Sequence, residues 1–411
     1  MTKIQKKEKN FFNTIIIGAG AAGLFFAAQP RISGDFLILE KTKNPATKLL
    51  MSGAGQCNLT HSGSMQEFLL CYGKNGKRIR TCLYKHNNKE LCNFFKALDV
   101  PLKERQDGKI FPASMDAKQV SNALLNTISK KGITIQYQKN ITALQKTAEG
   151  YTITTDNTTY TTKHLVIATG GCSYPSTGSD GSIFEILQKD LDIKITPRMP
   201  ALCPVYVEGY PFSELSGISI KNVQIKTANE KREGDLLFTH KNFSGPVILN
   251  HSRYMKAGQS LAINYVFPYT ISSMIAQLKK DLPGNNKLLE TYLSETYDLP
   301  KRFCDTVVEI TGLKRRKISS LGGKEINVIS QMLSQATYKI SGLGSFKEAM
   351  VTSGGVSLDE VNLNTMESKL HAGLYFIGEV LDIDGDTGGY NLQFCYSSAT
   401  AAAKHIVNNH V

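Results

Sequence analysis

Six residues near the start of the chain have the spacing of a phosphate-binding turn. They are Gly18, Ala19, Gly20, Ala21, Ala22 and Gly23. In a strand–turn–helix unit the first glycine permits a tight turn, the second lets the backbone approach a pyrophosphate, and the third lets the helix pack closely on the strand. The start of the helix then offers N–H groups and a positive dipole end to the phosphates. The pattern therefore predicts a dinucleotide cofactor.

Two carboxylates narrow the choice of cofactor. Glu40 ends the next apolar segment, where a carboxylate accepts hydrogen bonds from ribose hydroxyls. Near the C-terminus, Gly378 and Glu379 follow another apolar segment, and a carboxylate there can bind the ribitol chain of a flavin. Gly389 opens the last predicted helix, whose first N–H groups can stabilise negative charge on a reduced flavin ring. We therefore predict FAD.

The sequence predicts no metal site. Asp382, Asp384 and Asp386 have the alternate spacing of a calcium loop, but Gly and Glu are missing from the required positions. None of the eight Cys residues forms a CxxC pair, which argues against a zinc site or a dithiol redox centre. Cys57 and Cys172 lie in Gly-rich segments, so a reactive thiol is one interpretation, and a small packing residue is the favoured one.

The elements that position these residues follow from the hydrophobic pattern. Continuous apolar runs predict buried parallel strands at Phe11–Ile17, Asp35–Leu39, His164–Ala168 and Leu374–Ile377. Residues 64–131 are mostly helical in pattern, and Asn391–Asn408 reads as a terminal helix. A meander is predicted at Ile133–Tyr137, Ile141–Leu144, Tyr151–Thr155 and Thr158–Thr162. The ends of the chain, 1–196 and 352–411, therefore form one discontinuous α/β domain that binds FAD.

The middle of the chain differs in texture. Residues 197–270 are alternating and interrupted by Pro, which predicts an inserted antiparallel β domain, and 337–351 returns to it with a strand at Tyr338–Val351. Residues 271–336 are rich in Leu, Lys and Glu at helical spacing, which predicts a small helical subdomain.

Composition restricts the partners. No apolar run is long enough for a membrane span, and the polar start MTKIQKKEKN lacks the pattern of a signal peptide, so we expect a cytoplasmic protein without membrane contact. The net charge is +13, mostly dispersed, with local clusters at 74–80 and 314–317. A solvated basic surface without nucleic acid is the favoured interpretation, and RNA binding is the alternative. The sequence does not indicate an oligomeric state.

Four segments resemble the BaiN/YhiN-type FAD-dependent flavoprotein family, whose relatives include aminoacetone oxidase. They are Lys48–Asn58 (KLLMSGAGQCN), Ala168–Pro175 (ATGGCSYP), Phe238–Pro246 (FTHKNFSGP) and the C-terminal segment 373–393. The resemblance runs over nearly the whole chain. It implies a Rossmann-like FAD-binding domain of the two-dinucleotide type, interrupted by a β domain and a helical domain.

The resemblance also implies contacts to FAD. Ser52, Gly53 and Asn58 would lie along the flavin and pyrophosphate, and Thr169 and Gly170 would cover the adenosine end. The ribitol and flavin ring would be held by Gly378, Glu379, Gly389, Asn391 and Leu392. The predicted set is completed by Lys41, Lys48, Asp382 and Tyr390. Gln56 stands where the family usually has Arg, and it lacks the charge and the planar fork, so the anion contact of that Arg cannot be carried over.

Catalytic residues are harder to find from sequence. His240 is a candidate acid or base because its unperturbed pKa suits proton transfer, and a purely structural role in the β domain is the equal alternative. Tyr390 is a second candidate, since it and Tyr174 could stack on the flavin or simply pack. A second GxGxxG is absent, which argues against a dedicated NADPH domain, while NAD(P)H remains open as a transient electron donor.

These features predict an FAD-dependent oxidoreductase acting on a small molecule. Two reactions stay open: oxidation of an amine or aminoketone, and NAD(P)H-linked reduction of a conjugated double bond. An RNA-binding or RNA-modifying flavoprotein and a non-enzymatic FAD-binding protein are the alternatives from other classes.

Overall fold

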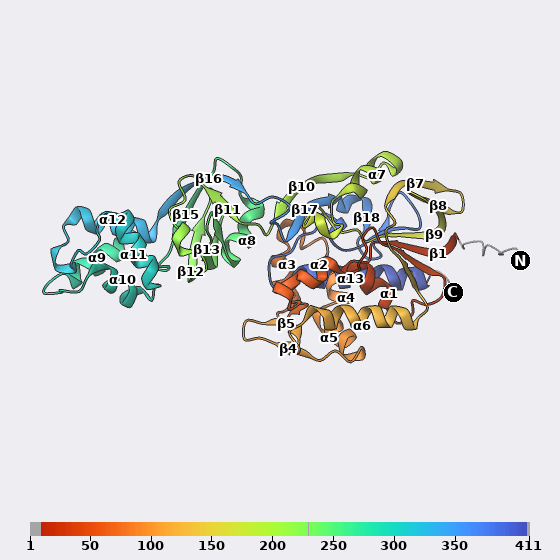
Figure 1. Cartoon of the computed structure of the whole chain (residues 1–411), viewed down its shortest axis with the longest axis horizontal. Coiled ribbons are helices and arrows are strands. Elements are labelled where there is room, and N and C mark those ends of the chain that lie inside the picture. The colour runs from red at the N-terminus through yellow and green to blue at the C-terminus, as the bar shows by residue number, and fades with distance from the viewer. Residues whose placement is uncertain (1–9, 229, 409–411) are drawn as a thin grey trace, which may run out of the picture. The chain divides into compact units, whose positions relative to one another are not determined.

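The computed structural model describes residues 10–228 and 230–408. The chain forms two compact units. In Figure 1 the second unit is drawn mainly in green to cyan, and the first in red to yellow with the C-terminal part in blue. The first unit consists of Met1–Met199 and Val351–Val411, and the second consists of Pro200–Met350. The chain leaves the first unit through β10 (Ile195–Ala201) and returns through β17 (Val351–Val356), which pairs with β10.

A parallel sheet is the centre of the first unit. Its strands run in the order β20, β9, β1, β2, β6, and each pairs in parallel with the next. The bounds are β1 Phe11–Ile17, β2 Phe36–Leu39, β6 Thr134–Gln136, β9 Thr159–Ile167 and β20 Leu374–Phe376. These strands form the core because their apolar runs are buried on both faces, as in α/β proteins generally.

Antiparallel strands extend this sheet. β18 (Val361–Asn362) and β19 (Glu367–Ser368) continue it beyond β20. β8 (Gly150–Thr155) pairs with the N-terminal half of β9, and β7 (Ile141–Thr147) pairs with β8. A separate small sheet has the order β3-β5-β4, with β3 Thr60–His61, β4 Leu102–Glu104 and β5 Lys109–Pro112.

Helices cover both faces of the parallel sheet. Figure 1 shows α1, α6 and α13 together on one side, and α7 with β7 and β8 on the other. The helices of this unit are α1 Ala21–Ala28, α2 Thr47–Met51, α3 Met65–Cys71, α4 Arg80–Lys85, α5 Asn88–Ala97, α6 Ala117–Lys130, α7 Ser182–Leu191 and α13 Tyr390–Asn408. Short 3-10 turns lie at Ser52–Gly55, Gly73–Asn75, Pro175–Thr177, Leu358–Glu360 and Gly378–Val380.

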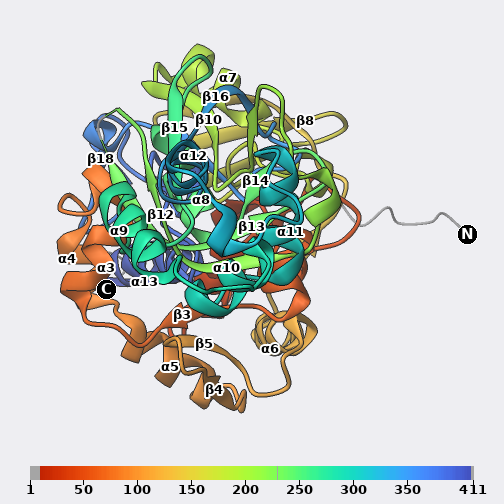
Figure 2. The same ribbon diagram turned by 90° about the vertical axis from the view of Figure 1, so that its left-hand side faces the viewer.

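The second unit is a closed antiparallel barrel with helices packed against it. Within the described residues its strand order is β11-β14-β13-β12-β15-β16. The bounds are β11 Val205–Val207, β12 Ser219–Lys226, β13 Lys231–Phe238, β14 Phe243–Ser244, β15 Ser260–Asn264 and β16 Ala336–Leu343. The helices are α8 Pro246–His251, α9 Ile271–Asp281, α10 Leu289–Tyr297, α11 Lys301–Ile310 and α12 Gly323–Ser334, with 3-10 turns at Ser213–Leu215, Ser252–Tyr254 and Ile318–Ser320. Helices α9 to α12 face the viewer in Figure 2.

One hydrophobic core joins the barrel to these helices. Phe238 of β13 stacks on Phe303 of α11 with ring centroids 5.5 Å apart, and Phe303 also contacts Tyr265, which follows β15. Residues 271–336 therefore share their core with the barrel.

The predicted fold class is confirmed: a Rossmann-like α/β domain is interrupted by an antiparallel β insert and helices. Two finer predictions were wrong. Thr158–Thr162 and His164–Ala168 are parts of one strand, β9, because Lys163 lies within a continuous ladder where the strand passes from β8 to β1. The return strand predicted to Val351 ends at Leu343 in β16, and β17 begins separately.

In the part of the chain that the structure describes, no helix has both the length and the apolar character needed to cross a membrane.

Candidate functional site

The carboxyl ends of four strands meet at one edge of the parallel sheet. Ile17 lies in register with Leu39 and Ile167, and Ile167 with Phe376. The predicted site residues at the ends of β1, β2, β9 and β20 therefore leave the sheet side by side. Open α/β sheets bind their ligands beyond this edge.

The three glycines of the first turn have different surroundings. Gly18 has a φ of +105°, and an added Cβ would lie 2.6 Å from the carbonyl oxygen of Ala168. At Gly23, where α1 crosses β1, a Cβ would lie 2.0 Å from the carbonyl oxygen of Gly18. At Gly20 a Cβ would meet nothing within 4 Å. The open space is thus at the residue whose backbone should approach a pyrophosphate.

Helix α1 begins at Ala21 directly beside this space. Its N-cap, Gly20, offers no side-chain hydrogen bond, and no acidic residue lies in the first turn. The N–H groups of a helix's first turn have no partner within the helix. They and the helix dipole favour an anion at this point.

Glu40 lies beside the turn, and its carboxylate is buried. One oxygen accepts from the N–H of Ala19 at 2.7 Å, and the other accepts from the N–H and the hydroxyl of Thr42, both at 2.7 Å. The carboxylate therefore fixes the turn through protein contacts. A carboxylate has about four acceptor sites, so it retains capacity for a ribose hydroxyl.

Lys41, next in the chain, forms an ion pair. Its ammonium lies 2.6 Å from Asp180 and 3.1 Å from the hydroxyl of Ser182, and both charged side chains are about one-third exposed. This contact ties the segment after β2 to the start of α7. It is a surface pair of small energetic value.

Two hydroxyl groups near the end of β9 lack partners. The side-chain oxygens of Thr169 and Ser179 are buried and make no hydrogen bond among the described residues. A Cβ at Gly170, whose φ is +74°, would lie 2.8 Å from the Ser179 oxygen, so the Ser179 hydroxyl lies beside Gly170. Buried polar atoms are nearly always hydrogen-bonded, so these two hydroxyls are available to bond a ligand. The observation fits the adenosine end of FAD.

The segment after α2 carries an unusual run of left-handed residues. Gly53, Ala54, Gly55 and Cys57 have φ values of 57°, 56°, 85° and 61°. The N–H of Cys57 bonds the carbonyl of Ser52 at 2.9 Å and closes the loop. Non-glycine residues in this region are strained, and such strain clusters at ligand-binding sites. Successive backbone N–H groups in such turns form anion-binding concavities.

Glu379 is held from both sides. Its carboxylate lies 2.6 Å from the ammonium of Lys48 and accepts from the N–H of Thr352 at 2.8 Å. The hydroxyl of Thr352 in turn accepts from the N–H of Cys172 at 2.7 Å. Thr352 thus links β17, the end of β9 and the C-terminal segment. Sequence reasoning missed it, although the Gly354-Gly355 doublet marks a close backbone approach in the same strand.

Gly378 places the C-terminal segment against α1. A Cβ at Gly378, where φ is +72°, would lie 2.7 Å from the Cβ of Ala22. Asp382, four residues later, accepts from the N–H of Gly354 at 3.1 Å, and its carbonyl accepts from the Asn75 side chain at 2.8 Å. Asp382 therefore connects the C-terminal segment to β17 and to Asn75.

The start of α13 is fixed by two amides. Asn391 accepts from the N–H of Gly385 at 2.8 Å and donates to its carbonyl at 2.9 Å. Asn58, with its amide oriented to suit its neighbours, accepts from the N–H of Gly389 at 3.1 Å and donates to Thr60. Leu392 is half-buried in the first helical turn. These contacts bring the 52–58 loop to the N-terminus of α13.

Tyr390 packs in an aromatic cluster. Its ring is stacked on His61 at 5.6 Å between centroids and meets Phe68 edge-on at 4.9 Å. The hydroxyl of Tyr72 donates to the Tyr390 carbonyl at 2.7 Å. Burial raises the pKa of Tyr390, so its hydroxyl stays protonated near neutral pH. These contacts give Tyr390 a packing role.

The other catalytic candidate, His240, belongs to the second unit. It is exposed in the turn between β13 and β14 of the second unit. His240 and the predicted residues at the sheet edge therefore belong to different units.

The thiols at the site are in a neutral state. Cys57 is fully buried, and burial raises its pKa to about 12. Burial also raises the pKa of Cys172. All eight Cys residues lie in the described ranges, and none of them forms a disulfide there. A thiol is reactive as the thiolate, so the packing interpretation of Cys57 and Cys172 is the one their surroundings support.

The start of α13 should respond to acid through His86. The His86 carbonyl accepts from Gln393 at 2.9 Å and from Ser397 at 2.6 Å, both in α13. Burial lowers the pKa of His86 to about 4, helped by the charges of Lys404 and Lys85. In the unfolded chain the pKa is about 6.5, so between these values the unfolded state binds more protons and stability falls as pH falls.

We therefore expect the free energy of unfolding to decrease by up to about 2–3 kcal/mol between pH 6.5 and 4 on account of His86. Thermal melts across this range should show a smaller decrease in a His86→Gln variant. The buried His251 of the second unit, with a pKa lowered to about 4, contributes the same trend to both proteins. Equal slopes in the two proteins would contradict the assignment.

Comparisons with known proteins agree with this architecture. The family model for the HI0933-like protein Rossmann domain matches residues 12–405. A ribosomal RNA dihydrouridine synthase of Escherichia coli (strain K12) is 28% identical over 96% of this chain and 98% of its own length. A 3-dehydro-bile acid delta(4,6)-reductase of Clostridium scindens is also 28% identical, over 95% of this chain and 97% of its own length.

A solved structure has a similar fold. The 3-ketosteroid-delta4-(5alpha)-dehydrogenase of Rhodococcus jostii RHA1 superimposes with a TM-score of 0.51 and covers 98% of this chain and 99% of that protein, at 14% identity. At this identity the likeness concerns the fold alone.

Proposed function

The chain belongs to the family of HI0933-like Rossmann-domain proteins, a family of FAD-dependent oxidoreductases, and from this premise we propose that it reduces the C5=C6 double bond of a uracil in ribosomal RNA. In uracil this bond is conjugated to a carbonyl group. Of the two predicted reactions, this is the reduction of a conjugated double bond. The substrate is RNA, which the sequence analysis gave as the alternative to a small molecule.

The residues at the sheet edge fit FAD. The Gly20 backbone and the first N–H groups of α1 would receive the pyrophosphate, because the space beside Gly20 is open. Thr169, Ser179 and Glu40 would bond the adenosine end, where two hydroxyls lack protein partners. Glu379 would bind the ribitol while Lys48 and Thr352 hold its carboxylate in place.

The bound FAD would supply a hydride from its reduced ring to the electron-poor carbon of the double bond. The residues of the chain would orient the flavin and the uracil and stabilise charge that develops on the flavin. The N–H groups in the first turn of α13, held in place by Asn391 and Asn58, would stabilise negative charge on the flavin. We propose NAD(P)H as the source of the electrons, reaching the site transiently. The balance is one NAD(P)H and one proton consumed per double bond reduced.

The single observation that carries the substrate assignment is the near full-length similarity to a ribosomal RNA dihydrouridine synthase. The bile-acid reductase is equally similar, and its name also describes the reduction of carbon–carbon double bonds. The net charge of +13 favours RNA, because a polyanion gains affinity by releasing counterions from its phosphates. Exposed Lys74, Lys77 and Arg80 form one basic cluster of the first unit. An RNA substrate would place the enzyme in the cytoplasm.

The proposal predicts a product. The purified holoenzyme, incubated with NAD(P)H and ribosomal RNA from cells lacking the gene, should form dihydrouridine, which mass spectrometry of the nucleoside digest detects. RNA binding should weaken steeply with salt. Parallel reactions with an unsaturated steroid ketone and with aminoacetone plus oxygen test the other two chemistries. Turnover of either compound without any dihydrouridine would contradict the RNA assignment.

A further inference from the structure

The sequence contains two groups of basic residues, at 74–80 and at 314–317, and their surroundings differ. In the second group, Lys314 and Arg316 each form an ion pair with a Glu side chain, at 3.1 and 3.0 Å. In the first group, Arg78 is the only member that forms an ion pair with a described residue. The remaining charges of the first group are therefore available to an anionic partner.

The first group belongs to a basic surface around α4. Residues 74–89 contain six Lys and Arg residues and no Asp or Glu. Ile79, Cys82 and Leu83 are buried, and this spacing places them on the inward side of the segment, so the exposed side chains lie on its outward side. We call the following exposed residues the α4 surface: Lys74, Lys77, Arg80, Tyr84 and Lys85.

The α4 surface includes an aromatic ring. Tyr84 is 39% exposed, and the Arg80 guanidinium, one helical turn earlier, lies 5.3 Å from the centroid of its ring. Proteins stack unpaired bases on aromatic rings and on guanidinium planes, and they hold the adjoining phosphates with cations. The α4 surface offers both kinds of contact.

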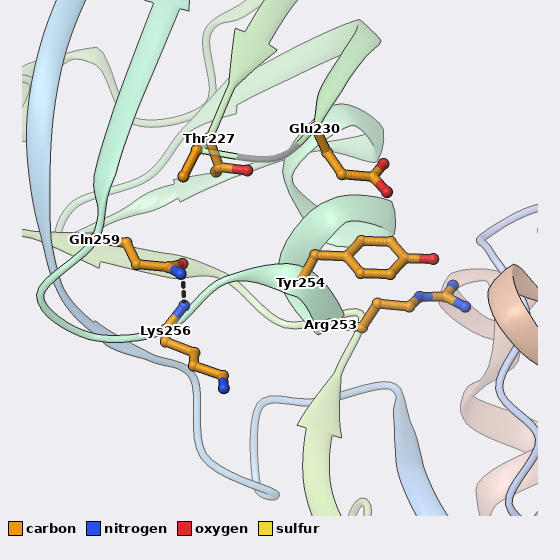
Figure 3. A pocket seen from close by; sticks show the side chains of 7 residues that line it. Thr227, Glu230, Arg253, Tyr254, Lys256 and Gln259 are labelled. Atoms are coloured by element: carbon orange, nitrogen blue, oxygen red, sulfur yellow. Dashed lines mark hydrogen bonds between the residues drawn. The ribbon is translucent and has the colours of Figure 1, made fainter.

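The basic residues that line a pocket of the second unit are arranged differently. In Figure 3, Arg253 and Lys256 extend to opposite sides of this pocket, which is also lined by Glu230. One phosphate cannot contact both basic side chains in this arrangement. The α4 surface is therefore the better match to a series of phosphates.

Hydrogen bonds connect the α4 surface to the segment that should face the flavin. Just before it, Tyr72 donates to the carbonyl of Tyr390 at 2.7 Å. The Asn75 side chain donates to the carbonyl of Asp382 at 2.8 Å. Just after it, the carbonyl of His86 accepts from two side chains of α13, at 2.9 and 2.6 Å, and Figure 1 shows α4 beside α13. RNA on this surface would thus be held by the unit that holds the flavin.

We propose that the α4 surface binds the phosphate backbone of the RNA substrate and holds an unpaired stretch of it beside the flavin site of the same unit. The cations would contact successive phosphates, and one base would stack on Tyr84. The inference rests on the proposed function and deepens it, because it names the surface that holds the RNA.

The test measures binding of a short labelled single-stranded RNA to the full-length holoenzyme by fluorescence anisotropy at several salt concentrations. The triple variant Lys74→Gln/Lys77→Gln/Arg80→Gln should bind about ten-fold more weakly, and the slope of log affinity against log salt should fall by about 2, since each phosphate contact contributes about 0.7. Tyr84→Ala should also weaken binding about ten-fold but leave the salt slope unchanged, because stacking releases no counterion.

The second basic group provides a matched control. Lys314→Gln/Arg315→Gln/Lys317→Gln removes the same residue types, two Lys and one Arg, from exposed positions. Its affinity for RNA should stay within about two-fold of wild type. All variants should retain wild-type FAD content and flavin reduction by NAD(P)H, which shows that they are folded.

The outcomes separate this inference from the proposed function. If the wild type binds no RNA, the proposed function fails. If the wild type binds RNA and the α4 triple variant binds it with the same affinity and salt slope, or the control loses as much affinity, only the α4 assignment fails. Vesicles of phosphatidylglycerol and phosphatidylcholine should not displace the RNA. Displacement would identify the α4 surface as a membrane-binding surface, which overturns its assignment to RNA.

Discussion

A Gly20→Val variant is expected to fold normally and to lose its FAD. Gly20 has an ordinary φ of −80°, and a side chain added there meets no protein atom within 4 Å. The new side chain would instead occupy the space through which the pyrophosphate reaches the N–H groups of α1. Each lost charge-assisted hydrogen bond costs about 1.5–3 kcal/mol, so flavin content should fall below about a tenth of wild type.

The measurement is the flavin absorbance per chain after purification and after incubation with excess FAD. The melting temperature should match that of wild-type protein stripped of FAD, which separates loss of cofactor from loss of fold. A folded Gly20→Val protein with normal flavin content would show that the pyrophosphate does not lie at this turn.

A Gly23→Val variant should have the opposite phenotype, a damaged fold. A Cβ at Gly23 would lie 2.0 Å from the carbonyl oxygen of Gly18 and 3.4 Å from the Ile16 side chain. Because the first neighbour is backbone, α1 must move away from β1, and overpacking of this kind costs about 3 kcal/mol or more. Urea unfolding of the FAD-free protein measures the loss.

Gly20→Val is the matched control for Gly23→Val, because it adds the same side chain to the same turn, three residues away, at a position where no protein atom lies within 4 Å. Equal stability of the two FAD-free variants would contradict the close approach of α1 to β1. The pair thus separates the residue that shapes the turn from the residue that leaves room for the ligand.

Much of the first unit could be predicted because its signals are local. β1 has the predicted bounds, since Phe11–Ile17 is a continuous apolar run that ends at a glycine turn. α13 starts one residue before the predicted Asn391, directly after the Gly388-Gly389 doublet. At Lys163 the charged residue suggested a boundary between two strands. The residues on both sides of it pair with neighbouring strands, so β9 continues through Lys163.

The site itself was only partly predictable, because the hydrogen bonds that stabilise it join residues far apart in the chain. Thr352 reaches Cys172, and the buried Gln393 accepts from Thr60 and donates to the carbonyl of His86. No local pattern links these residues, so sequence reasoning missed them. Thr42 and Ser179 were missed for the same reason: a hydroxyl is significant only once its neighbours are known.

If the proposed function is right, electrons from the reduced flavin reach a uracil in RNA. The most direct measurement is to reduce the holoenzyme without oxygen, remove excess reductant, add ribosomal RNA and follow the absorbance of oxidised flavin. We expect the flavin to be reoxidised and one dihydrouridine to form per flavin. A flavin that stays reduced with RNA, yet is reoxidised by an unsaturated steroid ketone in the same buffer, would contradict it.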